Sequence, residues 1–301
     1  MCVGCIVPEW DGRYLLHKEI DKDPAVVTMY DENGKKVLTA RISRSDFYSV
    51  FANAVAATHA GGILVGAAGD KTDGTRQSFL AMTDPAGRTT ESVLTSGFEH
   101  HRVCEAPDGS VWTLGFPWAP GNSPDAQKHI LRHYSWEKGL VGSFISIDSM
   151  AKSTGISEIV TPRDSYLHCG KDRVDVYLAP SAQYIEVNAS DKVSRWKVDM
   201  SSVIGGEPRG FAVTDDQNIF AAFSNSGGSK RANGLYALNA VPGNPIATLT
   251  PVEGTVNAPD ANIDLPEGAF HRLWGADGNS LVVSRERDGW GVSWVKVISS
   301  P

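Results

Sequence analysis

The chain lacks any long hydrophobic run and any amphipathic helical stretch of useful length. No apolar segment approaches the roughly 20 residues that a membrane-spanning helix needs. No charged segment followed by an apolar one opens the sequence as a leader would. A formal net charge of −7 gives no overall basic field, so nucleic acid and anionic membranes are not expected partners. We expect no membrane span and no export signal in the chain as written; the compartment stays open.

Cysteine is also scarce, with four residues in 301. That is too few for a densely cross-linked secreted domain. Cys2 and Cys5 form one C-x-x-C without a second pair at zinc-ribbon spacing, which favours small side chains packed in an inner strand over a metal or redox site. Residues 2–5 loosely resemble the end of a bacterial lipoprotein leader, so an exported protein with a trimmed N-terminus is one interpretation.

Signatures of catalysis are absent as well. The sequence has no G-x-S-x-G, no G-x-x-x-x-G-K-[ST] and no H-E-x-x-H. Its acidic residues scatter through turns, so no carboxylate pair for glycoside hydrolysis stands out. His129 and His133 are four apart in an expected strand, about 13 Å from each other, and are interpreted as solvent-facing. No catalytic residue, metal ligand or cofactor is predicted, and the sequence favours a protein that is not an enzyme.

What the sequence has in abundance is strands joined by tight turns. Six times an apolar strand enters a short turn and a second apolar strand leaves it, at spacings of 45 to 63 residues. These turns lie at residues 11–12, 61–62, 108–109, 171–172, 216–217 and 277–278. A second turn follows in five of the six units. Each unit therefore predicts a four-stranded antiparallel meander.

A meander repeated along the whole chain is typical of an all-β propeller. A β-sandwich has no reason to repeat a two-turn unit six times, and a βαβ fold needs helices that the sequence lacks. The second strands are apolar on both faces, as strands packed between neighbouring blades must be. We expect one propeller domain over residues 1–301 with six blades, the last with only three strands. The expected blades span residues 1–42, 47–95, 98–146, 158–200, 207–252 and 268–301.

The turn spacing, together with segments such as Ala-Pro-Asp-Gly-Ser-Val-Trp at residues 106–112, resembles the six-bladed propellers of the NHL and TolB-like kind. Many of those are exported bacterial proteins of unassigned role. The resemblance covers the whole chain and implies architecture. It carries no functional residues with it.

The longer connections are expected on one face of the propeller, where a rigid scaffold would hold binding loops. They are expected at residues 17–24, 43–48, 69–77, 117–128, 147–163, 224–233 and 252–269. On the inner strands, counting back from each first turn predicts equivalent positions around a channel mouth. The candidate ligand-binding residues there are Asn53, His100, His101, Arg102, Arg163, Asp164, Arg209, His271 and Arg272.

Arginine forks and histidines at a concave mouth suit a small anionic or polyhydroxylated ligand. Alternatively, these side chains only hydrate a narrow channel. We expect a non-catalytic propeller that binds such a ligand, or a protein or peptide, in an oligomeric state that the sequence leaves open.

The alternative is a metal-dependent hydrolase that resembles the gluconolactonase-type propellers. That resemblance implies a divalent cation held by Asn53, Asp164 and either Glu9 or Glu105, although the nearby arginines would oppose it. A purely structural module is a third possibility.

Overall fold

The structure, a computed structural model, divides into two compact units, Met1–Arg163 and Asp164–Pro301, each described here by itself. The residues described are 9–11, 13–19, 23–95, 97–118, 128–147, 165–203, 206–224, 234–252, 269–287 and 291–298. None of the helical segments among them has the length and hydrophobicity that crossing a membrane requires.

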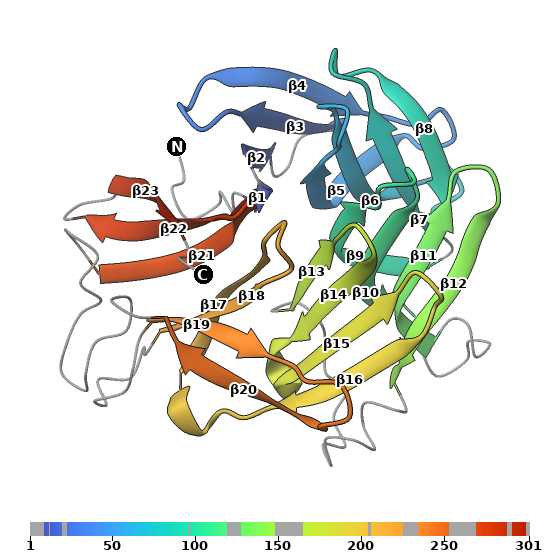
Figure 1. The fold of residues 1–301 in the computed structure, drawn as a ribbon. Coiled ribbons are helices and arrows are strands. Elements are labelled where there is room, and N and C mark those ends of the chain that lie inside the picture. The colour runs from blue at the N-terminus through green and yellow to red at the C-terminus, as the bar shows by residue number, and fades with distance from the viewer. Residues whose placement is uncertain are drawn as a thin grey trace. The chain divides into compact units, whose positions relative to one another are not determined.

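The first unit contains three four-stranded antiparallel meanders, each in sequential strand order (Figure 1). The first is β1 (Glu9–Asp11), β2 (Tyr14–Glu19), β3 (Ala25–Tyr30) and β4 (Lys36–Ile42). The second is β5 (Ser49–Ala57), β6 (Ile63–Asp70), β7 (Arg76–Thr83) and β8 (Thr89–Leu94). The third is β9 (Phe98–Glu105), β10 (Val111–Pro117), β11 (His129–Ser135) and β12 (Gly139–Ser146).

The second unit contains two further four-stranded meanders and a three-stranded one. The first is β13 (Tyr166–Cys169), β14 (Arg173–Leu178), β15 (Gln183–Asn188) and β16 (Val193–Val198). The second is β17 (Glu207–Val213), β18 (Ile219–Ser224), β19 (Gly234–Asn239) and β20 (Ile246–Pro251). The last is β21 (Ala269–Asp277), β22 (Ser280–Arg287) and β23 (Gly291–Ile298), and the short helices η5 (Ala179–Ser181) and η6 (Ser201–Val203) lie in connections. A parallel pairing of β16 with β20 joins the first two meanders into one eight-stranded sheet.

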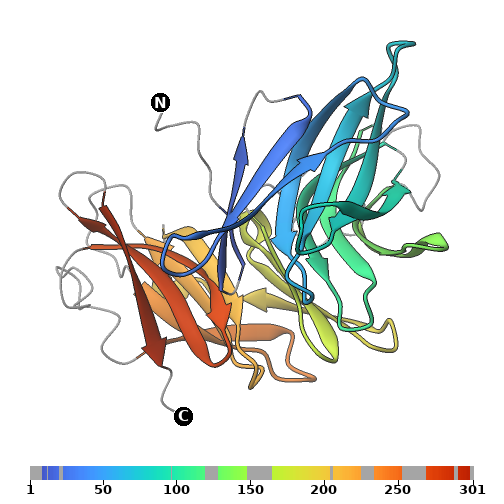
Figure 2. The same ribbon diagram turned by 90° about the horizontal axis from the view of Figure 1, so that it is seen from above.

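This arrangement confirms the all-β fold class, and the fold is that of a β-propeller. The last described meander has three strands, as the sequence predicted. Within each unit the first strand of one meander lies against the next meander, as β5 does with β9 and β17 does with β21. The strands of each meander twist relative to one another when seen from above (Figure 2).

The core follows from the hydrophobic pattern of the strands. Seven of the eight residues of β6 are buried, because this second strand is covered on both faces. The fourth strand β4 instead alternates exposed and buried residues, as an outer strand with one solvent face does. The prediction that second strands are apolar on both faces is therefore confirmed for β6.

Short polar side chains shape the tight turns. The Asp31 carboxylate accepts hydrogen bonds from the backbone N–H groups of Asn33 and Lys35, both at 2.9 Å. Asp84 accepts the equivalent bonds from Ala86 and Arg88 in the next meander. The hydrogen bonds from an aspartate carboxylate to the backbone of its own turn compete with the pairing that would lengthen the strand, so the strand ends there.

Two expectations need correction. The connection expected to be long at residues 69–77 is a tight turn, because Lys71 and Gly74 close it through backbone hydrogen bonds of 2.8 and 2.9 Å. Secondly, Cys104 of β9 and Cys169 of β13 are each disulfide-bonded, which the scarcity of cysteine did not suggest. Cys2 and Cys5 lie outside the described residues.

Candidate functional site

Four of the inner strands, β5, β9, β17 and β21, share one irregularity, a β-bulge. The register slips at Asn53 in β5, at His101 in β9, at Arg209 in β17 and at His271 in β21. Each of these residues is the extra one that has no partner across the ladder. The sequence predicted Asn53, His101 and Arg209 at equivalent positions, with His271 reached by a one-residue slip, and strand pairing places a bulge at each. Asp164, also predicted there, lies outside the described residues. Bulges re-aim a side chain and are common beside functional sites.

In the first unit the bulge of β9 orients His101. Its side chain is only 8% exposed, and Nε2 lies 3.1 Å from a carboxylate oxygen of the more exposed Glu99. Arg102 turns back and donates from Nη1 to the His101 carbonyl at 2.7 Å. The bulge thus carries an imidazole–carboxylate pair, with a guanidinium fixed on its backbone.

His100, next to this pair, is held inside the protein. Its Nε2 and Nδ1 lie 2.9 and 2.8 Å from the hydroxyls of Thr95 and Thr113. Burial, with smaller effects from Arg132 and His101, lowers the pKa of His100 to about 3, so the ring is neutral at physiological pH. Because both ring nitrogens have threonine partners, the local geometry gives His100 a packing role.

The bulge also explains how His100 packs. A Cβ added to Gly66 of β6 would lie 2.5 Å from the His100 Cβ and 3.1 Å from a Val103 methyl group. Residues three apart in a regular strand point to opposite faces. His100 and Val103 share a face because the extra residue, His101, lies between them.

A buried cation lies beside His100, and no sequence pattern pointed to it. Arg132 of β11 is fully buried, with its guanidinium carbon 4.1 Å from the centroid of the Phe98 ring. Nη1 lies 3.4 Å from both the Thr95 carbonyl and the Tyr134 hydroxyl. Only the folded structure brings this ring and these oxygens to Arg132, so the sequence HILRHYS could not reveal the role.

Asn53 occupies the equivalent bulge of β5 and is half-buried. Its backbone carbonyl accepts a hydrogen bond of 2.5 Å from Nζ of Lys18 in β2. The bulge of β5 is therefore fastened to the preceding meander through its backbone.

In the second unit, Arg209 is the bulge residue of β17. Its Nη2 donates to the Glu207 carboxylate at 2.8 Å, and the Arg209 side chain is 38% exposed. Gly210 follows with φ +147°, and a Cβ there would lie 1.8 Å from the Leu273 carbonyl oxygen of β21. Only glycine allows this approach of two backbones, which in turn fixes the bulge.

The remaining predicted residues lie wholly or partly outside the described part of the chain. Arg163 and Asp164 lie outside the described residues, as do the side chains of His271 and Arg272. Among the described side chains, no three His, Cys, Asp or Glu residues gather closely enough to hold a metal ion.

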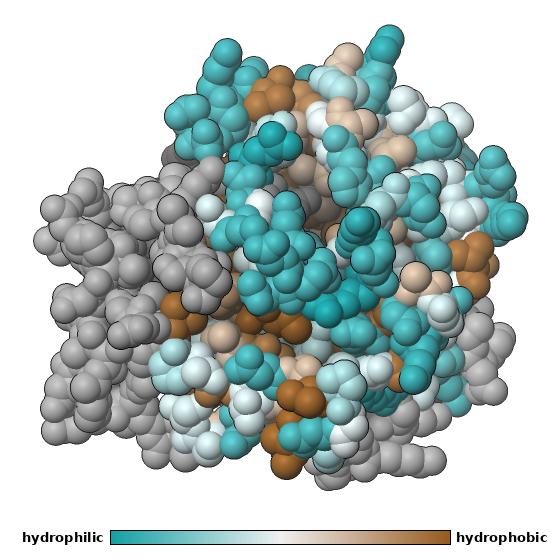
Figure 3. All heavy atoms as spheres, viewed as in Figure 1, coloured by the Kyte–Doolittle hydropathy of each residue, from teal (hydrophilic) through white to brown (hydrophobic). Residues whose placement is uncertain are grey.

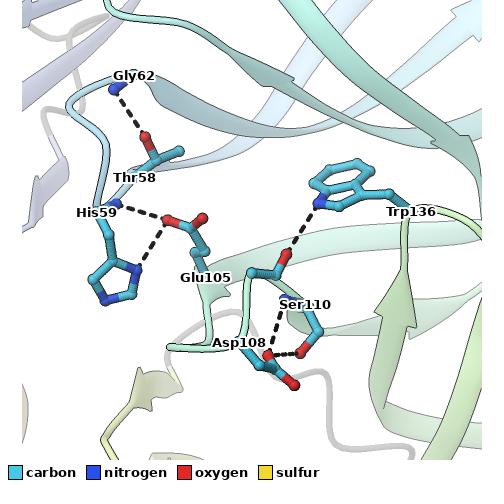
Figure 4. Close-up of polar contacts among 8 residues, drawn as sticks. Thr58, His59, Gly62, Glu105, Asp108, Ser110 and Trp136 are labelled. Carbon is cyan, nitrogen blue, oxygen red and sulfur yellow. Dashed lines mark hydrogen bonds and ion pairs between the residues drawn. The ribbon is translucent and has the colours of Figure 1, made fainter.

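The opposite ends of β5 and β9, at the tight turns, carry a set of polar contacts (Figure 4). Glu105 Oε2 accepts a 2.7 Å hydrogen bond from the His59 backbone N–H and lies 3.0 Å from His59 Nδ1. Trp136 Nε1 donates to the Gly109 carbonyl at 3.0 Å. Glu105 lies four residues beyond His101, about 13 Å along the strand. It therefore fastens neighbouring turns at the far end of β9 from the bulge.

A Ser, a His and an Asp also meet near these turns. Ser110 Oγ lies 2.6 Å from Asp108 Oδ1 and 2.8 Å from His133 Nε2. The carboxylate can only accept, so the hydroxyl donates to Asp108 and accepts from His133. In a nucleophilic triad the histidine stands in the middle and takes the serine proton. Here the serine stands in the middle, so the arrangement holds the turn together.

His133 also corrects an expectation. Its ring stacks on Trp112 with 4.3 Å between centroids and is half-buried. It is therefore a packed residue and not the solvent-facing histidine that the strand pattern predicted.

The second unit contains a buried ionic cluster on β14 and β15. Asp175 is fully buried; one oxygen lies 2.9 Å from Nε of Arg173 and accepts a 2.5 Å hydrogen bond from the Tyr184 hydroxyl. Arg173 also lies 3.4 Å from Glu186 and donates to the Gln217 carbonyl at 3.2 Å. Burial raises the pKa of Asp175 despite these partners. The cluster joins two meanders, and truncating one member would leave a buried charge uncompensated.

No protein-family model matches this chain, and neither does any curated protein. Similar solved structures include virginiamycin B lyase from Staphylococcus aureus, at 11% identity over 93% of this chain and 76% of that one, with a TM-score of 0.46. A luciferin-regenerating enzyme is 13% identical over 94% of this chain and 84% of its own, with a TM-score of 0.48. The WD40 domain of Toxoplasma gondii coronin is 10% identical over 98% and 81%, with a TM-score of 0.44. These are propeller-type folds, and likenesses this distant carry nothing about activity.

Proposed function

We propose that this propeller is a non-catalytic binding module whose inner-strand bulges present polar side chains to a small anionic or polyhydroxylated ligand. The observation that carries the proposal is the recurrence of the bulge at Asn53, His101 and Arg209. A ladder defect repeated at one register, with a polar residue at it each time, suits recognition better than packing does.

Of His101 and Arg209, the second unit's Arg209 is the more accessible. The Arg209 guanidinium pairs with Glu207, an exposed side chain that can turn away into solvent. A carboxylate or phosphate of a ligand then matches the guanidinium fork in two parallel hydrogen bonds. His101 in the first unit is more enclosed, so a ligand there would meet its ring edge beside Glu99.

Thermal melting with and without ligand tests the proposal. The probes are citrate and inositol hexakisphosphate for the anionic class, and myo-inositol for the polyhydroxylated class. We expect one of them to raise the melting temperature by several degrees, and Arg209→Ala or His101→Ala, made separately, to reduce that rise. Arg88→Ala is the matched control, because it removes an arginine from an exposed Arg88–Asp84 pair of 2.6 Å in an outer turn. An unchanged rise in both bulge variants contradicts the proposal.

The finer architecture belongs to the same proposal. Three meanders in each unit are what a six-bladed propeller of the NHL or TolB-like type requires. A crystal structure that shows another number of blades would refute this assignment.

The alternative, a metal-dependent hydrolase, has one observation in its favour, an amide side chain at the bulge of β5. Glu105, one of its expected ligands, binds His59 at the far end of β9 instead. Elemental analysis of the purified protein for Ca, Mg, Mn and Zn, followed by melting with chelator, separates the two functions. Stoichiometric metal with a chelator-sensitive melting temperature would favour the hydrolase and justify a lactone and ester screen.

A further inference from the structure

Three large aromatic side chains are exposed among the described residues, all in the first unit. These are Tyr48, Phe51 and Trp118. The described surface on the face drawn in Figure 3 is mostly hydrophilic, with hydrophobic residues in small separate groups. Exposed aromatic rings that lie together mark a recognition surface more often than isolated ones do. Tyr48 and Phe51 flank the start of β5, at the end away from the tight turns.

An ion pair lies beside the Phe51 ring and next to the backbone of Tyr48. Arg76 of β7 donates from Nε and Nη2 to the two carboxylate oxygens of Asp70 at 2.6 and 3.0 Å. Its guanidinium carbon lies 5.3 Å from the centroid of the Phe51 ring. The Tyr48 backbone N–H donates to the Asp70 carbonyl at 3.0 Å, so Asp70 fixes both neighbours. We call Tyr48, Phe51, Asp70 and Arg76 the aromatic platform.

The platform is open to solvent and yet rigidly supported. Tyr48 is 62% exposed, Phe51 39%, and the Arg76 side chain 54%. The strands that carry it are closely packed: Phe47 stacks on buried Phe79 with 5.4 Å between centroids, and a Cβ on Gly69 would strike the Phe47 ring at 2.4 Å. A flat surface that is already ordered loses little conformational entropy when a ligand binds.

The charges of the platform indicate the ligand class. Nε and Nη2 of Arg76 both bond Asp70. Asp70, with a smaller effect from Tyr48, raises the pKa of Arg76. Arg76 in turn lowers the pKa of Asp70. The pair therefore stays ionised with its charge balanced, which removes the attraction for an anion. What remains is a stacking face bordered by hydrogen-bonding groups of both kinds.

We propose that the aromatic platform binds a neutral oligosaccharide, one pyranose ring stacking on Tyr48 and Phe51 while its hydroxyl groups bond Arg76 and Asp70. The apolar face of a pyranose presents C–H groups to the negative face of an aromatic ring. Neighbouring sugar hydroxyls act as donors and acceptors, and so match a guanidinium and a carboxylate side by side. This site goes beyond the proposed function and stands whether or not the bulge residues bind a ligand.

Isothermal titration calorimetry of the full chain tests the site. The probes are the hexasaccharides of β-1,4-glucose, β-1,3-glucose, β-1,4-mannose and β-1,4-N-acetylglucosamine, with decaproline as a peptide that also stacks on aromatic rings. We expect at least one saccharide to bind with a submillimolar Kd. Tyr48→Ala and Phe51→Ala should each weaken that binding at least tenfold, and Tyr48→Phe should retain it.

Two controls make the result decisive. Leu140→Ala removes an exposed apolar side chain from β12 of the same unit and should leave affinity unchanged. Arg88→Ala removes an exposed arginine from the β7–β8 turn and should also leave it unchanged. Circular dichroism confirms that each variant is folded. Binding of no saccharide, binding of decaproline alone, or binding that survives both Tyr48→Ala and Phe51→Ala would overturn the proposal.

Discussion

The bulges of β9 and β17 carry the same backbone device with different surroundings. In each, a glutamate two residues earlier pairs with the bulge side chain, as Glu99 does with His101 and Glu207 with Arg209. His101 is 8% exposed and Arg209 38%. The difference teaches that a bulge fixes where a side chain starts, while the packing around it decides whether that side chain serves the core or the solvent.

The largest expected effect comes from the residue that follows the bulge in the second unit. Gly210→Ala adds a Cβ 1.8 Å from the Leu273 carbonyl oxygen, at a φ of +147° that alanine rarely adopts. We expect the free energy of unfolding to fall by at least about 4 kcal/mol, measured by urea denaturation. In β9 the same place is held by Arg102, so only the bulge of β17 should depend on a glycine.

Gly243→Ala is the matched control for this change. Gly243 also has a positive φ, +85°, but nothing lies within 4 Å of an added Cβ. Its substitution should cost only about 1 kcal/mol. Equal losses for the two variants would show that the close approach to Leu273 does not set the bulge.

Acid should destabilise the first unit through the residue before its bulge. The pKa of His100 is lowered to about 3 in the folded chain, against an ordinary value of 6.5. The unfolded chain therefore binds the proton first, so the free energy of unfolding falls as pH drops from about 6.5 toward 3. The expected loss is about 3–4 kcal/mol, and His100→Gln should remove it.

His168 provides the comparison in the second unit. Burial, more than the nearby Arg173, lowers its pKa to about 4, so its share of the acid loss should be smaller and complete by about that pH. Urea titrations of wild type, His100→Gln and His168→Gln between pH 7 and 3 check the order. A larger rescue by His168→Gln would contradict the burial assigned to His100.

Substitutions of His101 and Arg209 should separate the contribution of each bulge residue to stability from its contribution to binding. His101→Ala empties a buried position in β9, and we expect a loss of about 2 kcal/mol in the free energy of unfolding. Arg209→Ala breaks an exposed ion pair and should cost less than about 0.5 kcal/mol. Differential scanning calorimetry without ligand measures both. If Arg209→Ala costs as much as His101→Ala, Arg209 is a structural residue and the binding proposal for the second unit fails.

These contrasts also show how much of the fold and of the candidate site can be predicted from the sequence. Turn residues and strand alternation are local, so the meanders could be predicted, and aligning the turns was enough to find Asn53, His101 and Arg209 at one register. The directions of the side chains could not be predicted in the same way, because a bulge reverses which residues of a strand point inward and which point outward. His100 therefore packs on the same side as Val103, which a strict period of two would forbid.

The sequence did not predict the buried charges of Arg132 and Asp175. Arg132 depends on the Phe98 ring and on a carbonyl 37 residues away, and Asp175 depends on Tyr184 in the next strand. Their one-dimensional pattern is that of solvent-facing residues. Strand pairing brings the partners of Arg132 and Asp175 onto the same face of the sheet. A motif search sees only one strand at a time and therefore misses such clusters.

A small and local effect is expected at the other end of β9. Glu105→Ala removes the acceptor for the His59 backbone N–H and should lower the free energy of unfolding by about 1 kcal/mol. The local consequence is sharper, because amide hydrogen exchange at His59 should speed up while exchange within β11 stays unchanged. Ligand or saccharide affinity should not change, because Glu105 lies about 13 Å along the strand from His101. A variant that loses affinity would show that the tight turns and the bulge act together, and the separation drawn between the two ends of β9 would then fail.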